Sequence, residues 1–295
     1  MPLVPILLGA LTVSGLVLAI SWARAKNKPS GGFVPTPREL LIGFVTNFFD
    51  TLGIGSFAPT TAIFRLFSIV PDELIPGTLI VGHALPIVAQ ALFFVSTIAV
   101  DPLQMTAMIV ACVAGGWLGA GVVASLPRRA VQLGMGCALA IAAAFMLTGM
   151  LGTMPTGGTA LHLKPLAFAI ALAISAILGA FLTLGIGNYA PSLVTFSLLG
   201  MDPRAAFPIM MGSGAFVGTI AGLRFVKAGR FHSRVALGLT LGGIPAVIVA
   251  ATVVKSMPLG ALRWLVVIVV SYASVTLLRA GLQGQRTPER AQEAA

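Results

Sequence analysis

Nine apolar segments with few charged residues occupy most of the chain. They cover 3–22, 40–69, 75–99, 103–125, 128–151, 166–200, 205–226, 235–254 and 260–281. A run of about 20 apolar residues is long enough for a helix that crosses a lipid bilayer. Of the 295 residues, 57% are hydrophobic and only 9% are charged, which leaves too little polar surface for a soluble domain. The sequence therefore predicts an all-α integral membrane protein with several crossings.

The first apolar run, 3–22, is followed by basic residues, Arg24, Lys26 and Lys28. A secretory signal peptide carries its positive charge before the apolar run. We therefore interpret this run as a retained transmembrane helix whose C-terminal end faces the cytoplasm. With its basic linker it forms a leading part, 1–37.

Few residues are suited to catalysis, metal binding or nucleic-acid binding. Cys112 and Cys137 lie inside apolar runs, and His83, His162 and His232 are far apart in sequence, so neither set has the spacing of a metal site. The net charge of +10 comes mostly from short loops, without the interleaved aromatic residues of a nucleic-acid surface. The sequence contains neither a P-loop nor a clustered nucleophile and base. We expect no cofactor, no metal, no nucleic-acid partner and no enzymatic activity.

A glycine-containing stretch occurs twice, at a spacing of 132 residues. DTLGIGSFAPTTAIF (50–64) is repeated as LTLGIGNYAPSLVTF (182–196), and the same shift aligns Pro71 with Pro203. An internal repeat of this kind defines the architecture. The chain is divided into the leading part, a first copy at 38–152, a second copy at 165–282 and a polar tail at 283–295. Each copy contains four apolar segments and opens with the glycine-containing one.

Clusters of basic residues indicate how these segments cross the membrane. They lie at 24–28, 128–129, 224–234 and 279–290. Basic residues collect in cytoplasmic loops. All four clusters fall on that side only if the two glycine-containing segments enter the membrane and return. The N-terminus is then outside and the C-terminus is in the cytoplasm.

The lengths of the interrupted segments agree with such a re-entrant path. The halves 40–52 and 57–69 have about 13 residues each, too few to cross a bilayer alone. Each copy then contributes three full spans, an odd number, so we predict that the second copy is inverted relative to the first. A discontinuous helix that crosses the membrane fully is the alternative.

The two glycine breaks are the predicted substrate site. Paired interrupted helices in matching halves are typical of transporter binding sites, and the first N–H groups of a new half-helix favour an anion. Ser56 and Asn188 follow the last glycine and are expected to cap the half-helices and to face the ligand. Close helix packing at glycine is the alternative. The candidate binding residues are Asn47, Thr51, Gly53, Gly55, Ser56, Phe57, Thr183, Gly185, Gly187, Asn188 and Tyr189.

Three further polar residues lie in apolar segments of the first copy. Asp50 is a candidate for proton coupling because a carboxyl group inside a membrane is costly; the alternative is a neutral residue that holds the loop. An anion nearby requires that Asp50 be protonated, and the second copy has Leu182 in its place. His83 is a second candidate for proton transfer or an interhelical hydrogen bond. Asn47 lies one turn before Thr51, so it either lines the cavity or bonds across helices.

The stretches DTLGIGSFAPTTAIFRLF, IPGTLIVGHALPIVAQALFF and GGWLGAG resemble the TauE/SafE family of sulfite exporters, also called the 4-toluene sulfonate uptake permease family. The resemblance covers 38–282. It implies an inverted-repeat fold, a bacterial inner-membrane location and transport of sulfur-containing anions such as sulfite or organosulfonates. In the common family pattern more glycines follow GIG, whereas here Ser56-Phe57 and Asn188-Tyr189 follow it, which leaves the anion open.

We therefore expect a secondary transporter, an exporter of a small sulfur-containing anion held where the two broken helices meet. One alternative is a cation- or proton-coupled carrier of another small solute, with Asp50 as a cation ligand. Another is a membrane assembly factor without transport. The small residues Gly115, Gly116, Gly119 and Gly121 permit tight helix contact, within the chain or in a homodimer.

Overall fold

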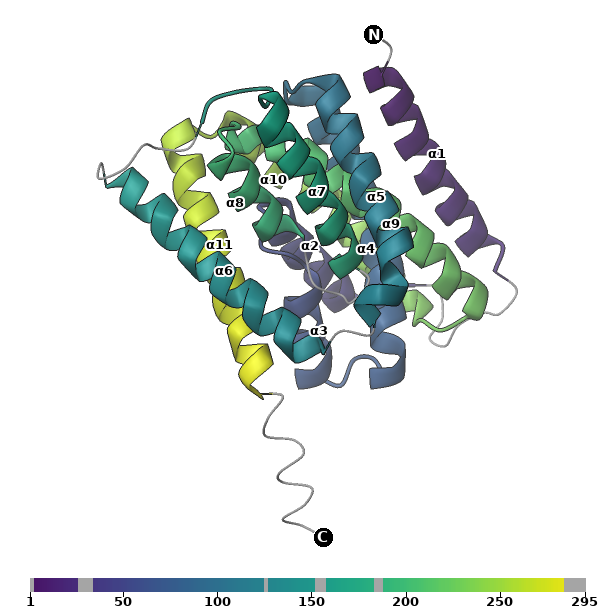
Figure 1. The fold of residues 1–295 in the computed structure, drawn as a ribbon. Helices are drawn as coiled ribbons and strands as arrows, with labels where there is room; N and C mark the ends of the chain where they lie inside the picture. The colour runs from purple at the N-terminus through teal and green to yellow at the C-terminus, as the bar shows by residue number, and fades with distance from the viewer. Residues whose placement is uncertain (1–2, 26–33, 125–126, 152–157, 183–187, 284–295) are drawn as a thin grey trace. The chain divides into compact units, whose positions relative to one another are not determined.

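The computed structural model describes residues 3–25, 34–124, 127–151, 158–182 and 188–283. These residues form α-helices and one short 3-10 helix, with no β-strand among them, which confirms the all-α prediction (Figure 1). The elements are α1 (Leu3–Ala23), α2 (Pro37–Thr51), α3 (Phe57–Leu66), η1 (Asp72–Leu74), α4 (Ile75–Thr97), α5 (Pro102–Ala124), α6 (Arg128–Met150), α7 (Pro165–Leu182), α8 (Tyr189–Leu198), α9 (Pro203–Ala228), α10 (Ser233–Ser256) and α11 (Leu259–Gln283).

Among the described residues, 7 helices are long and apolar enough to cross a membrane: α1, α4 with η1, α6, α7, α9, α10 and α11. Six of them are full spans expected from the sequence. The seventh expected span, α5, counts as a shorter apolar helix over its described stretch Pro102–Leu118. Of the broken segments, α2 and α3 are too short to cross, with 15 and 10 residues. The prediction of short halves is wrong for α7, whose 18 residues are long enough.

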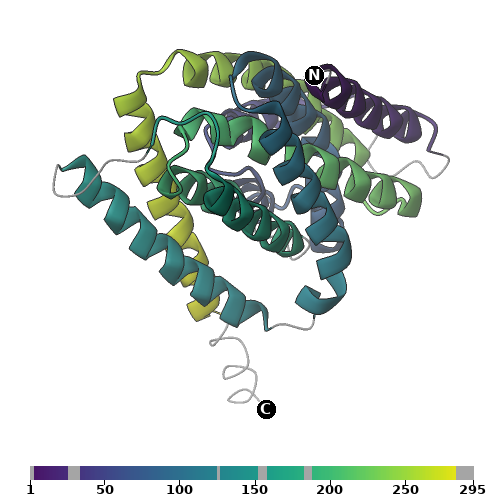
Figure 2. The same ribbon diagram turned by 45° about the horizontal axis from the view of Figure 1, so that its top comes forward.

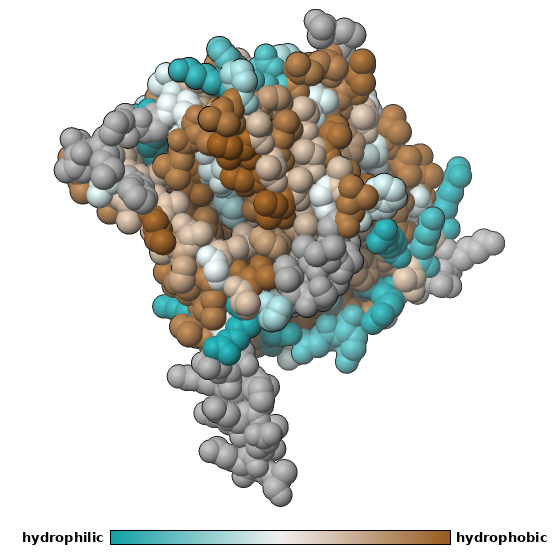
Figure 3. Space-filling view, viewed as in Figure 1, coloured by the Kyte–Doolittle hydropathy of each residue, from teal (hydrophilic) through white to brown (hydrophobic). Residues whose placement is uncertain are grey.

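Large apolar side chains cover much of the described surface. Hydrophobic residues colour most of the helix surfaces visible in Figure 3. Trp117 and Leu118 on α5 are 77% and 71% exposed, and α1 exposes a full row of aliphatic side chains. Exposed apolar surface on this scale needs a nonpolar solvent, and together with the seven apolar helices it indicates a multi-pass membrane protein.

The chain divides into two compact units that differ from the two sequence repeats. One unit contains Met1–Ile109 and Phe207–Met257, and the other contains Val110–Ala206 and Pro258–Ala295. In the first unit α10, which belongs to the second sequence copy, packs along α2 and α4, and α1 packs on α4 (Figure 1).

The pairing of α2 with α10 depends on glycine. A Cβ atom at Gly43 of α2 would lie 2.7 Å from the carbonyl oxygens of Gly238 and Leu239 on α10. Gly242 of α10 lies in turn against the carbonyl oxygen of Leu40. The two backbones therefore approach as closely as small residues allow, as is typical of helix pairs in membranes.

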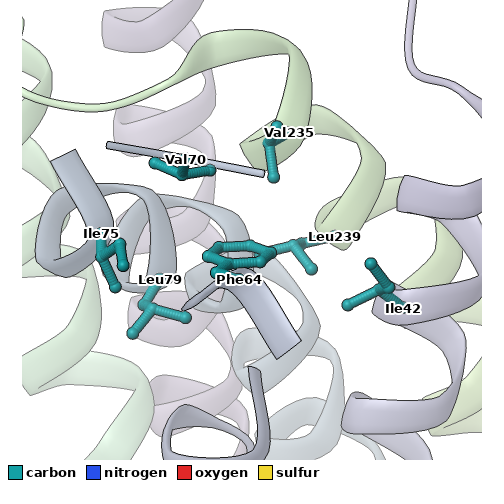
Figure 4. Close-up of a cluster of buried hydrophobic side chains, with 7 residues drawn as sticks. All are labelled: Ile42, Phe64, Val70, Ile75, Leu79, Val235 and Leu239. Atoms are coloured by element: carbon teal, nitrogen blue, oxygen red, sulfur yellow. The ribbon is translucent and has the colours of Figure 1, made fainter. Parts of the chain in front are cut away.

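An apolar cluster holds α3 against this helix pair (Figure 4). Phe64 of α3 is fully buried and lies among Leu79 of α4 and Leu239 of α10. The chain leaves α3 through a residue with positive φ, Ser68 at 48°, and the Ile69 N–H donates to the Phe64 carbonyl at 2.9 Å. This turn and the buried ring hold the C-terminal part of α3 against α4 and α10.

In the second unit α6 and α11 lie side by side, as both views show (Figure 2). The Ser274 hydroxyl of α11 donates to the Gly136 carbonyl of α6 at 2.8 Å. Within the same unit α8 packs against α6, α7 and α11.

Candidate functional site

The first helix break lies where the sequence predicts it. α2 ends at Thr51, and the chain then passes through Gly53 and Gly55, whose φ angles are 95° and 89°. Such positive φ values favour glycine. The Gly53 N–H donates to the Asp50 carbonyl at 2.8 Å, and α3 begins at Phe57. We refer to residues 52–56 with the first turn of α3 as the first tip.

Asp50 holds the first tip from inside. Its Oδ1 accepts the backbone N–H of Ser56 at 2.7 Å, and its Oδ2 accepts Nε2 of Gln90 on α4 at 2.9 Å. Nε2 of Gln90 also donates to the Thr51 hydroxyl at 3.1 Å. Asp50 is 2% exposed, and neither the Arg65–Asp72 nor the Arg234–Glu39 ion pair includes it. Asp50 therefore connects the end of α2 to the start of α3 and to α4.

His83 of α4 is fully buried beside the same tip. Its Nδ1 lies 3.0 Å from Oδ1 of Asn47, and its Nε2 lies 3.2 Å from the Thr60 hydroxyl of α3. Because the Asn47 oxygen can only accept, Nδ1 carries the hydrogen. The Thr60 hydroxyl also lies 2.7 Å from the Ser56 carbonyl. A hydroxyl has one hydrogen, so it donates either to His83 or to Ser56.

Asn47 makes the interhelical hydrogen bonds expected as one alternative. Its Nδ2 donates to the Gly43 carbonyl at 2.8 Å and to the Leu239 carbonyl of α10 at 3.4 Å. With the bond from His83, these contacts engage both the oxygen and the nitrogen of the Asn47 amide where α2, α4 and α10 pack together.

Pro86 interrupts α4 between His83 and Gln90. Proline has no N–H, so the Gly82 carbonyl loses its helical partner. The Thr240 hydroxyl of α10 donates to that carbonyl at 2.8 Å. This bond from α10 satisfies the carbonyl that Pro86 leaves without a helical partner.

The N-terminus of α3 presents hydrogen-bond donors. In the described part of the chain, the N–H groups of Phe57 and Ala58 have no acceptor. The Ser56 hydroxyl is buried beside the Asp50 carboxyl and has no other hydrogen-bond partner among the described residues. A Cβ at Gly55 would meet no described atom within 4 Å. The Phe57 ring packs against the His83 ring, with centroids 5.8 Å apart.

The prediction that Ser56 and Asn188 cap the half-helices through their side chains is wrong. Both occupy the N-cap position, but neither side chain makes a capping hydrogen bond. Their backbones have αR dihedrals, whereas a capping side chain reaches the N–H two or three residues on from an extended backbone. The Ser56 hydroxyl and the Asn188 Oδ1 are buried and make no capping hydrogen bond.

The second helix break lies partly outside the described residues, which include neither Thr183 nor Gly185 nor Gly187. The helix that follows it, α8, has the same 10-residue length as α3 and begins after the N-cap Asn188. Tyr189 is its first residue and is 9% exposed.

The two helices also end alike. Gly200 has a φ of 98° at the position equivalent to Ser68, and the Met201 N–H donates to the Phe196 carbonyl at 3.0 Å. The local geometry of the repeat is therefore the same at these two helices.

Four side chains of the buried polar network have no polar counterpart in the second copy. Gln90, which the sequence analysis missed, could have been found as a polar residue two helical turns from His83 on the same face. With the 132-residue shift, apolar or small residues of the second copy replace the main members of the network: Gly179 for Asn47, Leu182 for Asp50, Ala215 for His83 and Gly222 for Gln90.

No family model, curated protein or solved structure matches this chain. The assignment of a class therefore rests on the fold and the site. They define an all-α, multi-pass membrane protein with a polar helix break buried among its helices.

Proposed function

We propose that the chain is a secondary transporter, an exporter of a small sulfur-containing anion such as sulfite or an organosulfonate. The observation that carries the proposal is the first tip. Three features converge at the start of a half-helix: backbone N–H groups without a described acceptor, the buried Ser56 hydroxyl beside the Asp50 carboxyl, and Gly55, where a Cβ would meet no described atom within 4 Å. These groups suit an oxyanion, because a helix N-terminus combines free donors with a positive dipole end.

The free-energy cost of burying unsatisfied polar groups supports this assignment. Unsatisfied backbone and hydroxyl groups at membrane depth persist only where a cavity or a ligand supplies partners. A tip used purely for packing would gain from a small apolar residue in place of Ser56. Sulfur as the central atom of the anion comes from the family resemblance, which also supports a bacterial inner-membrane location, with the N-terminus outside and the C-terminus in the cytoplasm. The proposal assigns no catalytic step to the chain.

A flux panel tests the proposal. The purified protein is reconstituted in liposomes without any other component, and sulfite, sulfate, thiosulfate and organosulfonates are offered in turn. We expect saturable flux of at least one sulfur oxyanion. Flux of a cation with none of these anions would refute it.

A matched pair of variants connects the flux to the tip. Ser56→Ala removes one buried hydroxyl beside the Asp50 carboxyl, so the free energy of unfolding should change by no more than about 1 kcal/mol, the net contribution of one hydrogen bond. Loss of one hydrogen bond to a charged ligand should weaken anion binding about tenfold or more. The control is Ser96→Ala, at an exposed hydroxyl of α4 that donates to the Phe93 carbonyl, and it should leave flux unchanged.

A second candidate function is a cation-coupled carrier. It is favoured by the Asp50 carboxylate, which has no basic partner, and by the buried Gln90 Oε1, which has no described partner. Asp50→Asn distinguishes the two. Anion flux that persists in this variant excludes a required cation at Asp50, whereas cation flux that disappears with the carboxylate supports the second candidate.

A further inference from the structure

The carboxylate of Asp50 already occupies part of the place that a substrate anion would take. One of its oxygens accepts the Ser56 N–H, 2.7 Å away at the start of α3. The other is held at 2.9 Å by the amide of Gln90. A carboxylate with these two donors is an internal anion at a helix N-terminus, bound as an external oxyanion would be.

We infer that Asp50 competes with the substrate anion for the first tip, so that the anion binds only when Asp50 has taken up a proton. This inference rests on the proposed function, because it requires an anionic substrate at the tip. It identifies Asp50 as the residue that makes binding depend on pH. Each bound anion is then accompanied by one proton.

Electrostatic repulsion prevents the ionised Asp50 carboxylate and the substrate anion from occupying the first tip together. Asp50 is 2% exposed and fully surrounded by protein. Two negative charges a few ångströms apart repel strongly in such a weakly polar environment. A neutral carboxyl group loses this repulsion, and its hydrogen bond from the Ser56 N–H becomes an ordinary one that an anion can displace.

The Gln90 amide can form a hydrogen bond with Asp50 in both protonation states of the Asp50 side chain. In the observed state its Nε2 donates to the carboxylate, while its Oε1 is buried without a described partner. If the amide turns over, Oε1 faces Asp50 and accepts the hydrogen of the protonated carboxyl. The otherwise unexplained Oε1 is the acceptor that a protonated Asp50 needs.

We assign the pH dependence of anion binding to Asp50 rather than to the other charged or titratable groups on neighbouring elements. None of those on the elements packed against α2 makes a described hydrogen bond or ion pair with the Asp50 side chain. They are Arg38 and Glu39 on α2 itself, Arg65 on α3, His83 on α4, and Arg234 and Lys255 on α10. His83 is the nearest in the network, and it contacts Asn47 and Thr60 instead. The second copy has Leu182 at the equivalent position, so the competition is confined to the first tip.

Calorimetry of the full chain in detergent tests the inference. The probe is a short alkyl sulfonate, because its charge does not change over the pH range used, whereas sulfite itself titrates. Titrations in two buffers with different ionisation enthalpies count the protons taken up. At a pH where Asp50 is ionised in the free protein, we expect about one proton per sulfonate and an affinity that falls about tenfold per pH unit. Sulfonate binding without proton uptake would overturn the inference and leave the transporter proposal standing.

Three variants sharpen the test. Asp50→Asn should bind the sulfonate with no proton uptake and no dependence on pH. Asp72→Asn, at an exposed carboxyl of the same unit, should keep the wild-type count. Gln90→Leu removes both the donor to the charged carboxyl and the acceptor for the protonated one. Because the hydrogen bond to the charged carboxyl is the stronger of the two, the fall in affinity should move to higher pH.

Two results from these variants would contradict the inference: a proton count near one in folded Asp50→Asn, or a shift to lower pH in Gln90→Leu. If Asp50→Asn does not fold, the direction of the shift in Gln90→Leu decides. If wild-type protein binds neither the sulfonate nor any anion of the flux panel, the proposed function fails, and the inference fails with it.

Discussion

Replacing Gly43 by alanine tests whether the close contact of α2 with α10 stabilises the protein. The new Cβ would lie 2.7 Å from three backbone atoms of Gly238 and Leu239, whereas ordinary contact begins at 3.4 Å. The shortfall is therefore 0.7 Å, and backbone atoms cannot rotate away, so α2 has to move. Overpacking of this kind costs about 3 kcal/mol. Alanine recovers about 1 kcal/mol in helix propensity, which leaves a net loss of about 2 kcal/mol.

The assay is unfolding of the purified protein in mixed detergent, followed by circular dichroism. Gly218→Ala in α9 is the control, because a Cβ there meets no described atom within 4 Å. It should be neutral or stabilising by up to about 1 kcal/mol. A Gly43→Ala protein as stable as this control would refute the packing argument, and with it the view that α10 holds α2 in place.

Three further predictions each concern a single residue: Gly55, Thr240 and His232. Gly55→Ala should destabilise the protein by about 1–3 kcal/mol in the same unfolding assay, because alanine is strained at the φ of 89°. Gly55→Asn should lose less stability, because asparagine tolerates positive φ. Equal losses in the two variants would contradict this explanation. Thr240→Val leaves the Gly82 carbonyl without its donor and should cost about 1–3 kcal/mol, while Thr240→Ser should not. Burial, and then the Arg234 charge, lower the pKa of His232 from its ordinary value of 6.5, against an opposing effect of Glu39. The folded protein therefore binds fewer protons than the unfolded chain, and the melting temperature should fall as the pH drops below 6.5. In His232→Asn, which retains an acceptor for the Val235 N–H, the dependence on pH should be weaker; an unchanged dependence would assign it to another group.

The sequence predicts the helices well because the membrane imposes a simple rule. Apolar runs of sufficient length become helices, and their observed ends lie within a few residues of the expected ones. The break after Thr51 was predictable because the glycines there lie inside a run that is otherwise apolar. The 18-residue length of α7 was missed because the length argument used the halves of the first copy.

The polar network was harder to predict, because its contacts join residues that are distant in sequence. Asn47 reaches Leu239, 192 residues away, and Thr240 reaches Gly82, 158 residues away. Both contacts depend on α10 packing against α2 and α4, a pairing that hydrophobic periodicity does not indicate. Gln90 was overlooked because a single amide in an apolar helix has no motif, and its role becomes visible only opposite Asp50.

The most direct test of the central claim is to locate a bound anion. The structure is determined with a bromoalkyl sulfonate, and the anomalous signal of bromine marks the ligand. We predict the sulfonate oxygens at the first tip, within hydrogen-bond distance of the Ser56 hydroxyl and the N–H groups of Phe57 and Ala58. A fully occupied ligand elsewhere in the protein, with the first tip unchanged and Asp50 still bonded to Ser56, would contradict the account.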